Sequence, residues 1–247
     1  MKDLIPAERL IVAADFKPNG PQQGLEWLSD QIDYLLNDLQ GTGVYIKVGS
    51  ALRALDYRLI QRIHHKGLKC FVDFKLFDID NTLEIDGLWL AKYHPEIVTV
   101  ACATGSESMR ALKNKLPNTE ILGVTVLTTF DDEDCDQVYS LSVDRAVKRL
   151  AYLASHSDID GFVCSPAGAN ILRKEFVNRF TINTPGIRFA NSPVAHDTQN
   201  LNRVMTPAKA IKAGADRIIM GRPILEAKDR RAAVEQAIAE IKSTLSS

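Results

Sequence analysis

The order of apolar and amphipathic segments is the feature that most limits what this chain can fold into. Eight short apolar runs alternate with longer segments from one end of the sequence to the other. They predict strands at residues 10–14, 44–48, 70–74, 97–100, 121–126, 161–164, 180–182 and 217–220. Most of these runs are apolar at successive positions, which is typical of parallel strands that are buried on both faces.

The segments between these runs have helical patterning. Residues 25–39, 143–154 and 232–245 carry apolar side chains at spacings of three and four, as in a helix with one buried face. Alternating strands and helices predict parallel strands joined by crossover helices. Eight such units in 247 residues predict a single-domain (β/α)8 TIM barrel over residues 1–247, since these barrels typically have about 250 residues. An open doubly wound sheet is the alternative, but no GxGxxG follows the first run.

Composition and short motifs argue against several classes of protein. The formal net charge is −1, whereas a nucleic-acid-binding domain usually carries a basic excess. No apolar stretch approaches the roughly 20 residues of a membrane span, and the first residues lack the apolar region of a signal peptide. The four cysteines form no CxxC pair, and neither HExxH nor GxSxG occurs. We therefore expect a cytoplasmic protein with reduced thiols that binds neither nucleic acid nor a membrane.

Ionisable side chains gather where the first three predicted strands end. Asp15 follows the first strand and Lys47 lies near the end of the second. Asp73 and Lys75 end the third strand, and Asp78 lies just beyond it. Catalytic residues of (β/α)8 barrels lie at the C-terminal ends of strands, and two residues two apart on a strand point to one face. We predict an alternating chain of lysine and aspartate charges there. An ion-pair network that only fixes strand register is the alternative.

The last predicted strand ends in a sequence that suits a phosphate. Gly221 and Arg222 follow it directly, and loops after the seventh and eighth strands often bind phosphate in these barrels. Glycine allows close backbone approach, and the guanidinium group of arginine binds phosphate in a bidentate manner. A simple turn with a surface arginine is the alternative.

Together these residues resemble the orotidine 5′-phosphate decarboxylase family, whose members make uridine monophosphate in pyrimidine synthesis. The most specific part is Asp73-x-Lys75-x-x-Asp78, which is followed by Ile79, Asn81 and Thr82. Supporting segments stand in family order at residues 46–49, 126–129, 160–165, 184–188 and 205–207. The resemblance covers nearly the whole chain. The departures are Phe77 and Asp80, where the family usually has His and Pro, and Val-Ala-Cys in place of Val-His-Ala at residues 100–102.

The resemblance implies a lyase that converts orotidine 5′-phosphate to uridine 5′-phosphate without a metal or organic cofactor. Lys75 would protonate C6 of the pyrimidine, and Asp73 would lie beside the substrate carboxylate. The other residues implied in one subunit are Asp15 and Lys47 at the ribose hydroxyls, Thr128 in the substrate site, Arg188 at the start of a mobile loop, and Gly221 and Arg222 at the phosphate.

The resemblance also implies a homodimer with shared active sites. Asp78, with Ile79 and Thr82, would reach into the site of the other subunit and complete its catalytic set. In the long polar loop at residues 184–205, the family has a glutamine that contacts the phosphate and the pyrimidine. Counting back from the Met-Thr-Pro segment reaches Leu201, and we assign the role to the nearby Gln199.

Two other functions compete with this interpretation. A sugar-phosphate decarboxylase or aldolase of the same barrel superfamily shares the Asp-x-Lys-x-x-Asp pattern but forms an enediolate, usually with Mg²⁺. The strand that carries Lys47 and the segment 184–188 argue against it. A non-catalytic sensor of phosphate ligands would keep Gly221 and Arg222 but has no use for Lys75 between two aspartates.

Overall fold

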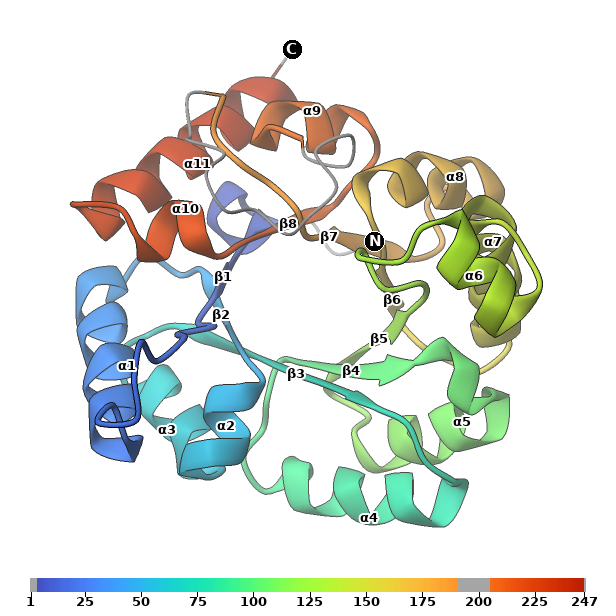
Figure 1. Cartoon of the computed structure of the whole chain (residues 1–247), viewed down its shortest axis with the longest axis horizontal. Coiled ribbons are helices and arrows are strands. Elements are labelled where there is room, and N and C mark those ends of the chain that lie inside the picture. The colour runs from blue at the N-terminus through green and yellow to red at the C-terminus, as the bar shows by residue number, and fades with distance from the viewer. Residues whose placement is uncertain (1–3, 191–204, 247) are drawn as a thin grey trace.

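The computed structural model, which describes residues 4–190 and 205–246, is a closed barrel of eight parallel strands (Figure 1). The strands follow one another around the barrel in chain order, and β8 closes it against β1. Their bounds are β1 (Leu10–Ala13), β2 (Tyr45–Val48), β3 (Lys69–Leu76), β4 (Ile97–Ala101), β5 (Glu120–Val124), β6 (Gly161–Val163), β7 (Thr181–Thr184) and β8 (Arg217–Met220). The predicted (β/α)8 TIM barrel is confirmed.

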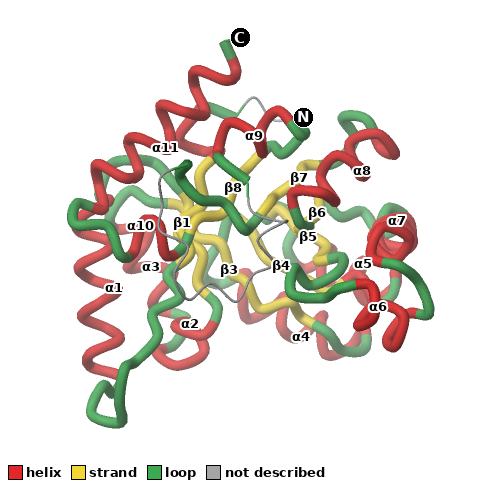
Figure 2. Tube along the Cα trace, turned by 45° about the horizontal axis from the view of Figure 1, so that its top comes forward, coloured by secondary structure: helices red, strands yellow, loops and turns green. Residues whose placement is uncertain are grey.

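Helices surround the barrel on the outside (Figures 1 and 2). The described α-helices are α1 (Leu25–Leu39), α2 (Ser50–Leu55), α3 (Arg58–His65), α4 (Asp80–Ala91), α5 (Ser106–Lys115), α6 (Asp132–Tyr139), α7 (Val143–Ala154), α8 (Pro166–Phe176), α9 (Pro207–Lys212), α10 (Arg222–Leu225) and α11 (Arg230–Leu245). Short 3₁₀ segments lie at Pro6–Arg9 and Cys102–Thr104. None of the described helices is both long and apolar enough to cross a membrane.

Side-chain caps define where several helices begin. Ser165 accepts a hydrogen bond from the Gly168 amide at the start of α8, where Pro166 is the first helical residue. Asp131 accepts one from the Asp134 amide at the start of α6. Such caps satisfy backbone N–H groups that have no partner within the helix, and proline is favoured at the first helical position. These local signals agree with the strand–helix alternation that the sequence predicts.

Two apolar clusters hold the barrel together. The larger one fills the space between strands and helices. The smaller one fills the barrel interior and consists of Ile11, Ala13, Tyr45, Phe71, Ile97, Leu122 and Ile219, with Val163 packed against them. Because alternate residues of each strand point inward, this inner layer forms a solid floor beneath the C-terminal ends of the strands.

One strand departs from regular geometry. The pairing of β3 with β4 runs from Val72 opposite Val98 to Leu76 opposite Val100, so three residues of β3 face a single residue of β4. In this bulge Lys75 has a φ of +49°, in the left-handed region that non-glycine residues adopt uncommonly. The strand predicted to end at residue 74 therefore continues to Leu76 through an irregular segment.

Candidate active site

A cavity of about 770 Å³ opens at the C-terminal ends of the strands, above the inner apolar layer. Phe71 and Ile219 of that layer form part of its wall. Eight of the residues predicted from the sequence line this cavity: Asp15, Lys47, Asp73, Lys75, Thr128, Arg188, Gly221 and Arg222. The barrel thus brings together side chains that are up to about 200 residues apart in the chain, at the barrel end where catalytic residues are expected.

The predicted chain of alternating charges is present. Lys47 Nζ lies 2.9 Å from Asp15 Oδ2 and 3.0 Å from Asp73 Oδ2. The same Asp73 oxygen lies 2.8 Å from Lys75 Nζ. The Lys47 and Asp73 side chains are each 11% exposed, whereas the Lys75 side chain is 42% exposed. The two buried charges therefore stabilise each other, and the Lys75 ammonium group remains accessible to a bound molecule.

This arrangement keeps the two buried members charged. Burial lowers the pKa of Lys47, but the Asp73 and Asp15 carboxylates outweigh that effect and leave the pKa raised. Burial likewise raises the pKa of Asp73, and the ammonium groups of Lys47 and Lys75 outweigh it and leave that pKa lowered. Opposite charges within about 4–6 Å favour the ionised form of each partner. Near neutral pH Asp73 is a carboxylate and Lys47 is an ammonium ion.

Thr99 is a site residue that the sequence analysis missed. Its hydroxyl group, fully buried on β4, donates a hydrogen bond to Asp73 Oδ1 at 3.0 Å and accepts one from the Lys75 amide at 2.9 Å. The available signal was a polar side chain inside the apolar run 97–100. Threonine is also a common strand residue, so the signal was weak.

Gly49, after β2, contributes through the absence of a side chain. A Cβ atom there would lie 2.9 Å from the Asp73 carbonyl oxygen, too close for any other residue without a backbone shift. Glycine at this position lets the chain after β2 pass close to the strand that carries Asp73 and Lys75. The sequence analysis noted this glycine as part of segment 46–49 but gave it no role.

The predicted phosphate residues line the same cavity from the end of β8, the strand that pairs with β1. Gly221 and Arg222 follow β8, and Arg222 begins the short helix α10. A Cβ atom on Gly221 would meet Ala13 at ordinary van der Waals distance. The fold itself therefore does not require glycine at this position.

The base of the long loop is held beside the cavity. Ile187 and Met205 form an isolated parallel bridge, in which the Arg188 amide donates to the Met205 carbonyl oxygen at 3.0 Å. This bridge fixes where the loop leaves and rejoins the barrel. Gln199 and the alternative position Leu201 lie outside the described residues.

The three residues assigned to a partner subunit, Asp78, Ile79 and Thr82, are not among the described residues that line the cavity of their own chain. The Asp78 amide donates to Thr104 Oγ1, and the Asp78 carbonyl oxygen accepts from the same hydroxyl group. Asp78 and Ile79 are exposed. Their role in the site of a partner subunit stays a prediction.

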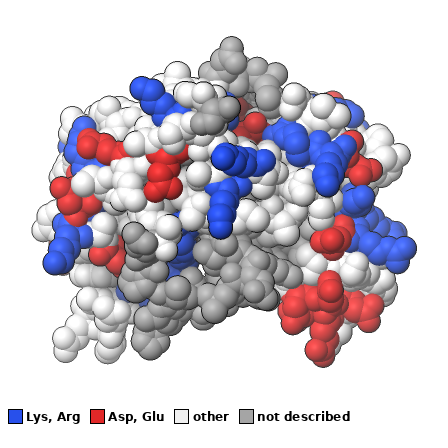
Figure 3. Space-filling model, turned by 90° about the horizontal axis from the view of Figure 1, so that it is seen from above, with Lys and Arg blue, Asp and Glu red and all other residues white. Residues whose placement is uncertain are grey.

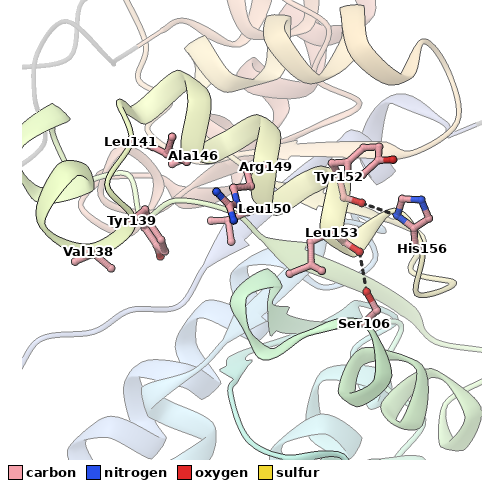
Figure 4. A pocket seen from close by; sticks show the side chains of 10 residues that line it. All are labelled: Ser106, Val138, Tyr139, Leu141, Ala146, Arg149, Leu150, Tyr152, Leu153 and His156. Carbon is pink, nitrogen blue, oxygen red and sulfur yellow. Dashed lines mark hydrogen bonds between the residues drawn. The ribbon is translucent and has the colours of Figure 1, made fainter.

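A second cavity of about 720 Å³ lies on the outside of the barrel among α5, α6 and α7 (Figure 4). Its wall is mainly apolar, with Val138, Leu150 and Leu153 among its members. The hydrogen bonds drawn there join Ser106 to the Leu153 carbonyl oxygen and His156 to the Tyr152 carbonyl oxygen. The described residues of this lining include Arg149 and His156 but no carboxylate, in contrast to the barrel cavity.

Comparison with known proteins decides the family. The model of the orotidine 5′-phosphate decarboxylase / HUMPS family matches residues 8–237. The chain belongs to this family. Curated members named orotidine 5′-phosphate decarboxylase include one from Methylobacterium nodulans, which is 37% identical over 243 residues and 96% of each chain. Another, from Idiomarina loihiensis, is 34% identical over 215 residues, 85% of this chain and 91% of that protein.

A solved structure supports the same family. The crystal structure of orotidine 5′-phosphate decarboxylase from Lactobacillus acidophilus superposes with a TM-score of 0.76 at 29% identity, covering 95% of this chain and 99% of that one. These comparisons confirm the family resemblance and the carboxy-lyase class that it implies.

Proposed function

We propose that this family member decarboxylates orotidine 5′-phosphate to uridine 5′-phosphate without a cofactor, as a step of pyrimidine biosynthesis. The observation that carries the proposal is the position of Asp73 Oδ2 between two ammonium groups, 3.0 Å from Lys47 Nζ and 2.8 Å from Lys75 Nζ. The names of its relatives support the choice of substrate. The roles below follow from this arrangement.

Lys75 is the proton donor in this proposal. Loss of CO₂ leaves negative charge on an sp² ring carbon, so the barrier falls only if positive charge is placed where that charge develops. The Lys75 ammonium group lines the cavity and is partly exposed to it. It would stabilise the carbanion and then transfer a proton to C6.

Asp73 would act on the group that leaves. Its carboxylate stays ionised because its pKa is lowered by the two lysines. A substrate carboxylate placed against it would be repelled, and that repulsion would be relieved as CO₂ departs. Destabilisation of a bound ground state is a contested source of rate, so we assign the larger effect to Lys75.

The remaining residues bind the parts of the substrate that do not react. Asp15 and Lys47 would hold the ribose hydroxyls, Thr128 would line the pyrimidine site, and Gly221 with Arg222 would hold the phosphate. Arg188 stands at the base of the loop that carries Gln199. Binding of the remote phosphate group would drive closure of this loop, so that binding energy is expressed mainly in the transition state.

We further propose a homodimer in the cytoplasm, with Asp78, Ile79 and Thr82 of one subunit completing the site of the other. The loop after β3 and the adjoining face of α4 expose five large apolar side chains: Phe77, Ile79, Ile85, Leu88 and Trp89. An apolar patch of this kind marks an interaction surface. The four cysteines are buried and free, as expected of a protein in a reducing compartment.

The charges of the cavity favour this reaction over a Mg²⁺-dependent aldolase reaction. A divalent cation would need Asp15 and Asp73 as ligands, since carboxylate oxygens are what Mg²⁺ prefers. The Lys47 ammonium group already stands within 3.0 Å of both carboxylates. A cation at that point would meet a like charge.

Absorbance measurements during conversion of orotidine 5′-phosphate, with and without EDTA, test the proposal. We expect turnover that EDTA does not change. Turnover abolished by EDTA would favour the Mg²⁺-dependent class. Tight binding of uridine 5′-phosphate without any turnover of orotidine 5′-phosphate would favour a phosphate-ligand sensor.

A further inference from the structure

The peptide bond between Phe74 and Lys75 is held from both sides by side chains. Its N–H group, which belongs to Lys75, donates to Thr99 Oγ1 at 2.9 Å. Its carbonyl oxygen, which belongs to Phe74, accepts from Arg53 Nη2 at 2.8 Å. Two side chains from different elements, β4 and α2, therefore fix a single peptide plane.

The bulge in β3 explains why side chains are needed there. Between Val72 and Leu76 the strand pairing with β4 is interrupted, so this peptide lacks its regular partners. Buried backbone groups without a partner are costly, and native proteins nearly always pair them. The left-handed conformation of Lys75, with φ of +49°, persists only where the surroundings impose it.

The Thr99 hydroxyl group also orients the neighbouring carboxylate. A hydroxyl group has one proton to donate and two lone pairs, and Thr99 donates its proton to Asp73 Oδ1 at 3.0 Å. This bond fixes Oδ1 and turns Oδ2 toward the lysines, where it meets both ammonium groups. One fully buried hydroxyl group thus contacts the backbone of Lys75 and the side chain of Asp73.

We propose that Thr99 is a positioning residue that sets the Lys75 ammonium and the Asp73 carboxylate in their reacting geometry, with Arg53 as a second, outer hold on the same peptide. The kinetic part of this inference rests on the proposed function. Thr99 is not among the described residues that line the cavity, so it acts through the two groups it orients. Arg53 is exposed, and its Cζ atom lies 4.8 Å from the centroid of the Phe74 ring. Water can therefore replace part of its hydrogen bonding to the Phe74 carbonyl oxygen.

Three variants at Thr99 and one control test the kinetic part. Thr99→Val keeps the shape of the side chain and loses both hydrogen bonds. Thr99→Ala replaces it in the test if the valine variant does not fold. Thr99→Ser keeps the hydroxyl group. Thr119→Val is the matched control. Thr119 is also buried, its hydroxyl group donates a hydrogen bond to the Pro95 carbonyl oxygen at 2.8 Å, and it precedes β5 at the other end of the barrel.

We expect kcat of Thr99→Val to fall about 100-fold with little change in KM, because misplacement of reacting groups by about 1 Å costs that much. Thr99→Ser should stay within about 10-fold of the wild type, because its hydroxyl group can make both hydrogen bonds again. The acidic limb of the kcat/KM profile should move to higher pH in Thr99→Val, because Asp73 loses a bond to its charged form. Thr119→Val should retain wild-type kcat.

Amide hydrogen exchange at Lys75 tests the hydrogen bonding of the Phe74–Lys75 peptide directly and needs no substrate. We expect slow exchange in the wild type and in Thr99→Ser, fast exchange in Thr99→Val, and intermediate exchange in Arg53→Met. Equal protection of the Lys75 amide in all four proteins would overturn the proposal. So would a Thr99→Val enzyme whose kcat and pH profile match those of Thr119→Val. A wild-type protein that fails to turn over orotidine 5′-phosphate would instead refute the proposed function, and the exchange result would still decide the role of Thr99.

Discussion

Lys75 Nζ lies 2.8 Å from Asp73 Oδ2, and the backbone of Lys75 is left-handed at that point. In a regular strand, alternation alone would direct both side chains to one face. Here Lys75 lies within the bulge of β3, and the two side chains still meet. The ion pair is complete within the chain, before any substrate binds. Groups that are already oriented cost no reorganisation when charge develops during the reaction.

Removal of the Lys75 ammonium group should abolish decarboxylation and leave the fold intact. We expect kcat of Lys75→Ala to fall by at least about 10³-fold, the combined size of a lost proton donor and a lost electrostatic contact. Stability should change by no more than about 1 kcal/mol, because the Lys75 side chain is 42% exposed. Steady-state kinetics and urea unfolding measure the two quantities.

Lys148→Ala is the matched control for this variant. Lys148 is an exposed lysine paired with Glu175 at 3.3 Å on the outside of the barrel. Its removal should leave kcat unchanged. A Lys75→Ala enzyme that turns over as fast as Lys148→Ala would end the assignment of Lys75 as proton donor.

The lowered pKa of Asp73 predicts how stability depends on pH in acid. The folded state holds this carboxyl group ionised more strongly than the unfolded chain, whose aspartates titrate near pH 3.9. The resulting stabilisation is complete above that value and is lost as pH falls through the lower pKa of the folded state. Its slope reaches at most about 1.4 kcal/mol per pH unit.

Urea unfolding of the wild type and Asp73→Asn between pH 2 and pH 7 measures this contribution. The variant should lose stability less steeply below pH 4 than the wild type does. Asp144→Asn, which changes an exposed carboxylate on α7, should follow the wild-type curve. If Asp73→Asn and Asp144→Asn gave the same curve, Asp73 would not be the group that titrates.

How far the sequence predicted this site can be argued from particular residues. Alternating apolar runs predicted the barrel because burial on both faces leaves a strong local pattern. Charges at the ends of those runs predicted Asp15, Lys47, Asp73 and Lys75 because few buried strands end in ionised groups. All four line one cavity.

What the sequence did not predict depends on contacts between distant segments. Thr99 looks like an ordinary strand residue until β4 pairs with the bulge of β3. Gly49 becomes necessary only when the Asp73 carbonyl oxygen approaches it. The strand predicted at residues 121–126 ends at Val124, and Val126 and Thr128 beyond it line the cavity.

Shared active sites predict that two inactive variants restore each other. In a hybrid dimer of Lys75→Ala and Asp78→Ala subunits, one site receives both wild-type residues and the other receives neither. Equal mixing with free subunit exchange should therefore recover about one quarter of wild-type activity, because half of the dimers are hybrids with one intact site. Each variant assayed alone provides the baseline. No recovery, with subunit exchange demonstrated by mass spectrometry, would contradict cross-subunit sites.

A second buried ion pair lies at the opposite end of the barrel from the cavity. Arg217 on β8 is fully buried, with Nη1 at 2.8 Å from Glu120 Oε2 and Nη2 at 3.1 Å from Glu120 Oε1. The guanidinium group also lies over the Tyr45 ring at 5.2 Å. Residues at this end of a (β/α)8 barrel contribute to stability rather than to chemistry.

Breaking this pair should therefore cost stability and leave the reaction unchanged. Arg217→Met leaves the Glu120 carboxylate buried without its main counter-charge, so we expect about 3–5 kcal/mol of destabilisation. Adding Glu120→Gln removes that charge and should recover part of the loss. The double variant should therefore lose less unfolding free energy than the sum of the losses in the two single variants. Urea unfolding of the four proteins measures the coupling, and kcat per folded molecule should stay at the wild-type value. Additive losses would mean that the two charges do not stabilise each other, and a fall in kcat would mean that the barrel floor transmits changes to Lys75.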